Sequence, residues 1–210
     1  MRYNLGNWIR FTAIVISGLH YAAESSEDIA NADLNLYEVL NTHHPLFLFE
    51  LKSRSPVERN CTGYTCLIET RTCEHMRQIT LGPTIYHFKV STTGDLATWR
   101  NESFLGQFVM NTTPPYEMDV YKFQNPEEAP HYLWELKYNE PNTYNCSVFY
   151  IYNQTTDSSG DSTCALYVRG VPGKRVNPTL DCQISFNNCS ESRVVFKPYI
   201  DKCSKLVPDR

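Results

Sequence analysis

The sequence predicts an all-β, antiparallel fold in a secreted chain that disulfides hold together. From the first helix to about residue 168, the chain reads as short β-rich runs, separated by segments rich in Asn, Gly, Pro, Asp and Ser. These runs alternate apolar and polar residues, as strands with one buried face do. Eight cysteines follow an apolar leader, and an even number of cysteines behind a leader is typical of disulfides.

The first residues have the composition of a secretory signal peptide. Arg2 and Arg10 precede an apolar stretch, residues 11–23, that ends in the small residues Ala22 and Ala23. This stretch is shorter than the roughly 20 residues of a membrane helix. We therefore expect residues 1–23 to be a signal peptide and residues 24–210 to form a single secreted domain with no membrane span.

The charge of the chain argues against nucleic acid as a partner. The formal net charge is -4, and the Lys and Arg residues are scattered along the sequence. Proteins that bind nucleic acid or anionic membranes gather basic residues on one surface. We expect neither partner here.

A short helix is expected over residues 28–41, with Asp28 as its N-cap, and eight strands after it. The expected strands are residues 45–53, 63–71, 78–91, 103–111, 116–123, 131–138, 145–152 and 163–169. Most connections between them have hairpin length, so neighbouring strands should be antiparallel.

Large aromatic and aliphatic residues share one face of these runs. In residues 131–138, Trp134 and Leu136 lie opposite Glu135 and Lys137. A sheet with one such face either closes into a barrel or packs against a second sheet as a sandwich. The alternation alone leaves both open, and an eight-stranded barrel has room for one small ligand.

Acceptors for N-linked sugar are frequent. They are Asn60, Asn101, Asn111, Asn145, Asn153 and Asn188. In three of them the middle residue is Cys, which makes a weaker acceptor once that Cys is bridged. We expect at least some of these sites to carry sugar in a secreted chain.

No pattern in the sequence predicts catalysis. GxSxG, HExxH, P-loop and dinucleotide fingerprints are absent from it. It also has no CxxC pair and no paired His spacing of the kind that zinc sites use. We expect no catalytic residues, no cofactor and no metal.

The later cysteines carry a resemblance to a known family. Cys146-Ser-Val is followed by Ala165-Leu-Tyr and then by Cys182. This resembles the salivary lipocalins of ticks, the histamine-binding-protein-like lipocalins, whose amine binders carry Cys-Asp-(Val/Ile/Leu), Glu-Leu-(Trp/Tyr) and Cys. The segments DLNLYEVLN, TIYHFKVSTTGDLATW and YLWELKYNEPNTYNCSVFYI agree with it, so the resemblance covers most of the mature chain. It favours the eight-stranded barrel over the sandwich.

The resemblance also implies disulfides and a C-terminal helix packed on the barrel. It pairs Cys146 with Cys182, and it pairs an early-strand cysteine, Cys66, with Cys203. The remaining cysteines, Cys61, Cys73, Cys164 and Cys189, would form further bridges in an unassigned order. These bridges would fasten a helix around residues 180–189 and the final segment to the barrel wall.

The chain departs from the amine binders at two positions. Ser147 and Ala165 stand where those proteins place Asp and Glu. A buried ammonium without a carboxylate costs several kcal/mol, so we expect no histamine or serotonin binding at that site. Glu50, Glu69 or Asp119, if it faced inward, would restore it.

The expected ligand is therefore a small hydrophobic molecule, such as a sterol like cholesterol, a fatty acid or an eicosanoid. The candidate lining is Phe47, Phe49, Tyr86, Phe88, Phe104, Phe108, Trp134, Ser147, Phe149, Ile151, Ala165 and Tyr167. Ser147 and Tyr86 would supply the polar contacts. The alternative is that these aromatics simply fill the barrel.

The resemblance implies a role in modulating host inflammation or immunity by capturing such a molecule. A second hypothesis is action through the outer surface on a host immune protein or cell. Amine scavenging ranks third and a secreted enzyme last.

Overall fold

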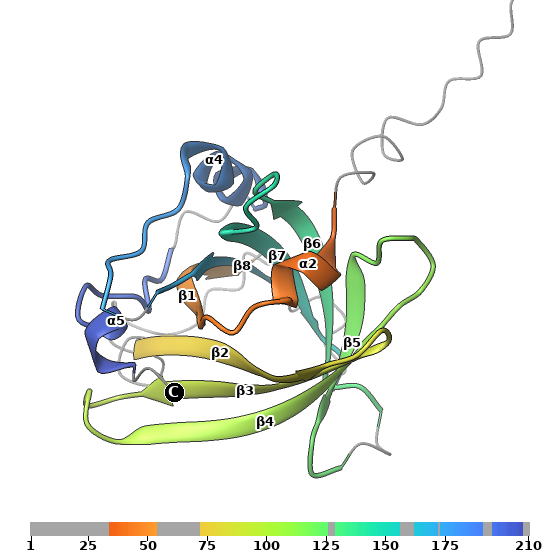
Figure 1. The fold of residues 1–210 in the computed structure, drawn as a ribbon, viewed down its shortest axis with the longest axis horizontal. Coiled ribbons are helices and arrows are strands. Elements are labelled where there is room, and N and C mark those ends of the chain that lie inside the picture. Colours follow the sequence, from red (N-terminus) through yellow and green to blue (C-terminus); the bar gives the residue numbers. More distant parts are fainter. Residues whose placement is uncertain are drawn as a thin grey trace, which may run out of the picture.

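A closed eight-stranded barrel forms the body of the protein (Figure 1). The computed structural model describes residues 34–53, 72–125, 129–155, 162–171, 173–190 and 195–207. The strands are β1 (Leu46–Ser53), β2 (Thr72–Leu81), β3 (Ile85–Thr93), β4 (Trp99–Phe108), β5 (Glu117–Lys122), β6 (Tyr132–Asn139), β7 (Cys146–Asn153) and β8 (Ser162–Arg169). Each strand pairs antiparallel with the next, and β8 pairs with β1. The predicted antiparallel barrel is confirmed, and the sandwich is wrong.

One expected strand was assigned incorrectly. The run 78–91 is not a single strand, because β2 ends at Leu81 and β3 begins at Ile85. The backbone N–H of Gly82 donates to the carbonyl of Ile85 at 2.8 Å and closes the turn between them. Pro83 cannot donate to a sheet, so the chain reverses there. The expected strand 63–71 lies outside the described residues.

A short helix, α2 (Leu36–Leu40), covers one end of the barrel (Figure 1). Asn35 caps it by accepting a hydrogen bond from the backbone N–H three residues later, at 3.1 Å. Leu36 and Leu40 are fully buried in the barrel interior. Arg169, at the end of β8, donates to two backbone carbonyls of the helix at 3.0 and 3.1 Å. The expected start of this helix at Asp28 is wrong, because the helix begins at Leu36 with Asn35 as its N-cap; Asp28 itself lies outside the described residues.

The helix α4 (Leu180–Asn188) packs on the outside of the barrel against β6, β7 and β8, as the resemblance implies (Figure 1). It has Lys52 of β1 at its C-terminal end. Lys52 Nζ donates to the carbonyls of Asn187 and Ser190 at 2.8 and 2.9 Å and lies 5.0 Å from the ring centre of Phe186. A cation at this place satisfies carbonyls that the helix leaves free. A last short helix, α5 (Cys203–Leu206), follows near the chain end.

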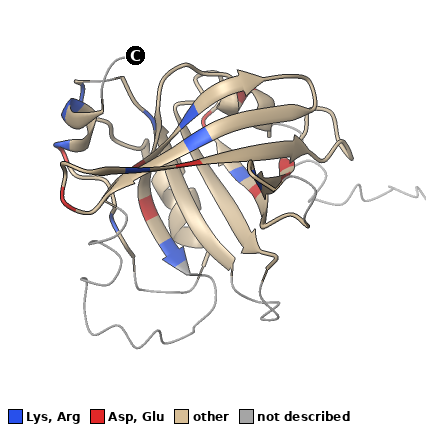
Figure 2. Cartoon of the chain, turned by 90° about the horizontal axis from the view of Figure 1, so that it is seen from below, with Lys and Arg blue, Asp and Glu red and all other residues tan. Residues whose placement is uncertain are grey.

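The C-terminal segment covers a second apolar cluster on the outer wall of the barrel. This outer cluster comprises Phe47, Cys73, Cys146, Val148, Cys164, Leu166, Val168, Val176, Cys182, Phe186, Cys189, Tyr199, Cys203 and Val207. Strands β1, β7 and β8 are therefore buried on both faces. Elsewhere on the barrel, acidic and basic residues are interspersed along the strands (Figure 2).

Among the described residues, three disulfides join barrel strands to the C-terminal segment, residues 173–207. They are Cys73–Cys203, Cys146–Cys182 and Cys164–Cys189. The second is the pair that the resemblance implies, and the third is one of the bridges it left unassigned.

The expected pair Cys66–Cys203 is wrong, because Cys203 is bonded to Cys73. The backbone explains the choice. Cys73 N donates to the carbonyl of Pro198 at 2.9 Å, so the tail runs directly beside the start of β2. This places the Cα atoms of Cys73 and Cys203 5.1 Å apart, within the range that a disulfide spans. Cys61 and Cys66 lie outside the described residues.

Gly170, directly after β8, should not tolerate a side chain. A Cβ there would lie 2.3 and 2.5 Å from two ring carbons of Phe47. That ring is fully buried against Tyr199 and His75 and has little room to move. We expect Gly170→Ala to lower the free energy of unfolding by about 1–3 kcal/mol, measured by urea denaturation.

The matched control is Gly82→Ala in the β2–β3 turn. Its Cβ would meet only the carbonyl oxygen of Ile85, at the ordinary distance of 3.7 Å. Equal losses in the two variants would contradict the steric explanation.

Candidate functional site

The inward faces of the strands, together with α2, form one apolar cluster inside the barrel. This interior cluster comprises Leu34, Leu36, Val39, Leu40, Leu46, Leu48, Leu51, Met76, Tyr86, Phe88, Phe104, Phe108, Met118, Val120, Trp134, Leu136, Phe149, Ala165 and Tyr167. Strand alternation produces it, since every second residue of β5 and β6 points inward. The interior is therefore a candidate site for an apolar ligand.

Aromatic rings meet across this interior. Tyr86 stacks on Phe88 with ring centres 4.9 Å apart, and Phe88 stacks on Phe104 of β4 at 5.6 Å. Phe88 also lies 5.9 Å from Trp134, edge to face. Because β3 and β6 are not neighbouring strands, this last contact spans the barrel.

Trp134 is the centre of the ring network. It stacks on Tyr167 of β8 at 5.8 Å and meets Phe149 of β7 edge to face at 5.5 Å. Phe149 and Tyr167 contact each other at 5.7 Å. The indole thus has aromatic neighbours from three other strands.

Two polar groups stand out among these rings. Trp134 Nε1 is buried, and no described residue accepts a hydrogen bond from it. Burial raises the pKa of the Tyr86 hydroxyl above its usual value, so Tyr86 stays neutral at physiological pH. The interior therefore offers neutral hydrogen-bonding groups in an aromatic setting.

Most of the candidate lining residues are brought together in the interior. Tyr86, Phe88, Phe104, Phe108, Trp134, Phe149, Ala165 and Tyr167 belong to the interior cluster, and Ile151 packs against it. Ser147 is also buried, and it pairs in register with the inward-facing Tyr167.

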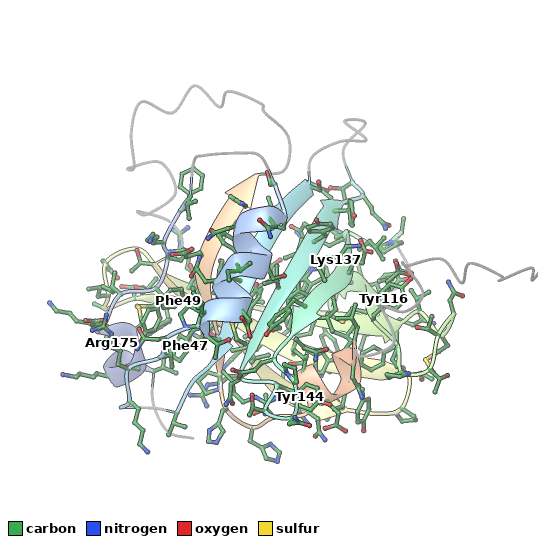
Figure 3. The ribbon with its side chains drawn as sticks, turned by 90° about the horizontal axis from the view of Figure 1, so that it is seen from above. Phe47, Phe49, Tyr116, Lys137, Tyr144 and Arg175 are labelled. Atoms are coloured by element: carbon green, nitrogen blue, oxygen red, sulfur yellow. A yellow bond between two sulfur atoms is a disulfide. The ribbon has the colours of Figure 1, made fainter. Side chains whose placement is uncertain are left out.

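Phe47 and Phe49 do not line the interior. Phe47 belongs to the outer cluster and Phe49 packs against it; Phe47 meets Tyr199 edge to face at 5.4 Å, and Phe49 stacks on Tyr199 at 5.3 Å. Figure 3 labels both beside the C-terminal segment. The inward positions of β1 belong instead to Leu46 and Leu48. The run LFLF is apolar on both faces, because the C-terminal segment covers its outer face. The prediction that its Phe residues point inward is therefore wrong.

The candidate lining left out most of the aliphatic part of the interior. Leu136 was already placed on the apolar face of its run, and the residues left out altogether include Leu46, Leu48, Met76, Met118 and Val120. Alternation around Asp119 was a usable signal, since Met118 and Val120 flank it on the other face of β5.

The acidic side chains that could rescue amine binding are not inside the barrel where the structure describes them. Glu50 lies on the outer side, where it pairs with Lys197 at 2.8 Å and accepts from Gln183 at 2.9 Å. A β-bulge after Leu48 turns it outward. Asp119 lies between two inward-facing residues of β5 and so points outward. Glu69 is outside the described residues.

Within the described ranges, no group of three or more His, Cys, Asp or Glu side chains is arranged to hold a metal ion. No helix there is long and apolar enough to cross a bilayer.

The glycosylation acceptors differ in accessibility. The exposed ones are Asn101, Asn111, Asn145 and Asn188. Asn153 is half-buried, and its Oδ1 accepts hydrogen bonds from the backbone N–H and hydroxyl of Thr155. Asn60 lies outside the described residues. Sugar at these sites stays a prediction.

Several solved structures are similar to this chain. Japanin from Rhipicephalus appendiculatus bound to cholesterol is 12% identical, with 72% of this chain and 90% of that chain covered and a TM-score of 0.44. Lobster apocrustacyanin A1 is 10% identical, with 69% of each chain covered and a TM-score of 0.42. Bovine odorant binding protein in complex with undecanal is 14% identical, with 74% and 82% covered and a TM-score of 0.37. No family model and no curated protein matches the sequence. These likenesses concern the fold and add nothing about the ligand.

Proposed function

We propose that this protein is a secreted lipocalin that binds a small hydrophobic molecule inside its barrel. The observation that carries the proposal is the ring network around Trp134, enclosed by eight strands and α2. Small-molecule sites are concave, mostly apolar and equipped with a few polar groups. Glu50 and Asp119 lie outside the barrel, so neither balances the charge of an amine within it.

The energetics favour an apolar ligand in such a setting. A sterol or fatty acid that buries about 300 Å² gains roughly 7 kcal/mol at about 25 cal/mol per Å², before ordering costs. A charged amine would lose its hydration and gain no carboxylate from Ser147 or Ala165.

The finer proposal is a tick-type salivary lipocalin that captures a sterol such as cholesterol, a fatty acid or an eicosanoid and so modulates host inflammation or immunity. Its support is the pattern from Cys146 to Cys182 and the disulfide between them. Residues 1–23 would be the signal peptide and 24–210 the single secreted domain. Three disulfides among the described residues fit an oxidising compartment.

The direct test is to identify what the protein carries. Protein secreted by eukaryotic cells would be extracted with organic solvent and also weighed intact by native mass spectrometry. We expect a co-purifying lipid, or displacement of a fluorescent fatty-acid probe by sterols or fatty acids. Finding neither would overturn the proposal.

Filling the interior should weaken binding. Ala165 is fully buried and pairs in register with Phe149 and Leu51. We expect Ala165→Trp to lower the affinity for the fatty-acid probe at least about tenfold, because the indole takes the ligand's place. The control is Ile184→Trp on the exposed face of α4, and circular dichroism checks that both variants fold.

The outer wall favours a second candidate function, binding to a host protein. Ile79, Ile85 and Phe123 are exposed apolar residues of the barrel wall and its rim, and Phe123 stacks on His87 with ring centres 4.2 Å apart. Exposed apolar patches often mark interaction sites. If Ala165→Trp abolishes probe binding and leaves activity on immune cells unchanged, surface action replaces ligand capture.

A further inference from the structure

The indole N–H of Trp134 is a hydrogen-bond donor held inside the barrel without an acceptor. Trp134 is 6% exposed, and its Nε1 is buried with no partner among the described residues. A buried donor left unpaired costs about 1–3 kcal/mol. Buried indole N–H groups normally have a partner, so this one calls for an acceptor that the described residues do not supply.

Water is a poor candidate for this acceptor. A buried water needs about two to four polar partners to be held. The rings of Phe88 and Phe149 approach the indole from β3 and β7 and offer a water no such partners.

The donor restricts the chemistry of the ligand. An indole N–H can only donate, so its partner must carry a lone pair on oxygen or an equivalent acceptor. An alkylammonium has only donors and cannot pair with it. A saturated hydrocarbon has neither a donor nor an acceptor. A carboxylate can accept the hydrogen bond from the indole. It would, however, bring a negative charge among the aromatic side chains of Phe88, Phe149 and Tyr167, where burying an unpaired charge is costly.

Resting on the proposed function, we infer that Trp134 is the specificity-determining residue of the interior site and selects neutral lipids that carry a hydroxyl or carbonyl oxygen. The ligand oxygen accepts from Trp134 Nε1, and its hydrocarbon part packs on the rings of Phe88, Phe149 and Tyr167. Tyr86 lies farther along the same network, stacked on Phe88, and is kept neutral by its burial.

A matched ligand series tests the inference on the full chain. Dodecanol, dodecane and dodecylamine share one hydrocarbon chain and differ at its end, and their affinities would be measured by displacement of the neutral fluorescent probe N-phenyl-1-naphthylamine. Dodecanol should bind most tightly. Trp134→Phe keeps an aromatic ring and removes the N–H, so it should weaken dodecanol binding about three- to tenfold and leave dodecane binding unchanged.

Trp99→Phe is the matched control, because Trp99 packs against the outer cluster and meets His75 edge to face at 5.3 Å. It should change no affinity in the series. A second measurement uses the wild-type protein. The nuclear magnetic resonance signal of the Trp134 indole N–H, identified by its loss in Trp134→Phe, should move downfield with dodecanol and not with dodecane.

The outcomes separate the two proposals. Binding of dodecanol and dodecane with equal affinity and an unmoved indole signal would overturn the role of Trp134 and leave the carrier function standing. Preferential binding of dodecylamine would overturn the inferred ligand class. Failure of the whole series to displace the probe, with no lipid on the purified protein, would overturn the proposed function together with this inference.

Discussion

Removing the Cys73–Cys203 bridge is expected to lower the free energy of unfolding by about 5 kcal/mol, the largest loss for any of the three described bridges. The two cysteines are 130 residues apart in sequence, against 36 for Cys146–Cys182 and 25 for Cys164–Cys189. A bridge restricts the unfolded chain more when it closes a longer loop, so the chain-entropy model gives about 4 and about 3.5 kcal/mol for the shorter ones.

The measurement is urea denaturation of variants in which both partners are replaced by Ala. Replacing both avoids a free buried thiol that could form a disulfide with another cysteine. Cys164→Ala with Cys189→Ala is the matched control, since it removes a bridge from the same C-terminal segment. If the long bridge contributes no more than the short one, its stabilisation arises from local packing and not from loop closure.

Most of the strands and their inward faces could be predicted because strand alternation is a local property, whereas the choice of a barrel over a sandwich came from the resemblance. In β6, Trp134 and Leu136 face the interior, while Glu135 and Lys137 form an ion pair outside it. The hairpin between β2 and β3 also has a local signal, because Gly82 and Pro83 are typical turn residues. The prediction of a single strand over residues 78–91 did not take that signal into account. Such local errors could have been avoided from the sequence alone.

Other features depend on the tail and could not be read locally. Whether Phe47 or Leu46 faces inward is undecided in a run that is apolar on both faces. It is settled by Tyr199, which lies far along the chain and covers Phe47 from outside. The disulfide partner of Cys203 also depends on the C-terminal segment. The hydrogen bond between Cys73 N and the carbonyl of Pro198 brings Cys73 close to Cys203.

The candidate site shows the same division. The residue types of the ring network follow from alternation, and most of its members were predicted. The unpaired N–H of Trp134 was not predictable, since whether a donor finds an acceptor depends on side chains from several strands. In the sequence, Tyr86 and Trp134 are both aromatic residues with one polar group. Only the packed barrel identifies Trp134 as the one whose buried polar atom has no partner among the described residues.

Acidification should destabilise the protein through His75. This side chain is 4% exposed, and burial is the main cause that lowers its pKa from 6.5 to about 4, with Arg77 and Lys89 adding repulsion. Its hydrogen bond to the carbonyl of Cys73, at 2.9 Å, acts in the opposite direction. Between these two pKa values the unfolded chain binds the extra proton and the folded chain does not, so stability rises with pH there. The contribution is complete above pH 6.5 and declines by about 3 kcal/mol as the pH falls to 4.

His75→Phe should remove this decline, because the replacement cannot titrate. Its loss of stability at pH 7 relative to the wild type should shrink at pH 4, where wild-type His75 carries the cost of protonation. Urea denaturation across this pH range measures the difference, and replacing the exposed His44 serves as control. A constant difference between wild type and His75→Phe at every pH would show that the ring is protonated equally in the folded and unfolded states.

Phe47 and Trp99 pack against the His75 ring at 5.6 and 5.3 Å, so protonation should first loosen the contact between β2 and the C-terminal segment. Hydrogen exchange at the backbone N–H of Cys73, which bonds to Pro198, would report that loosening directly.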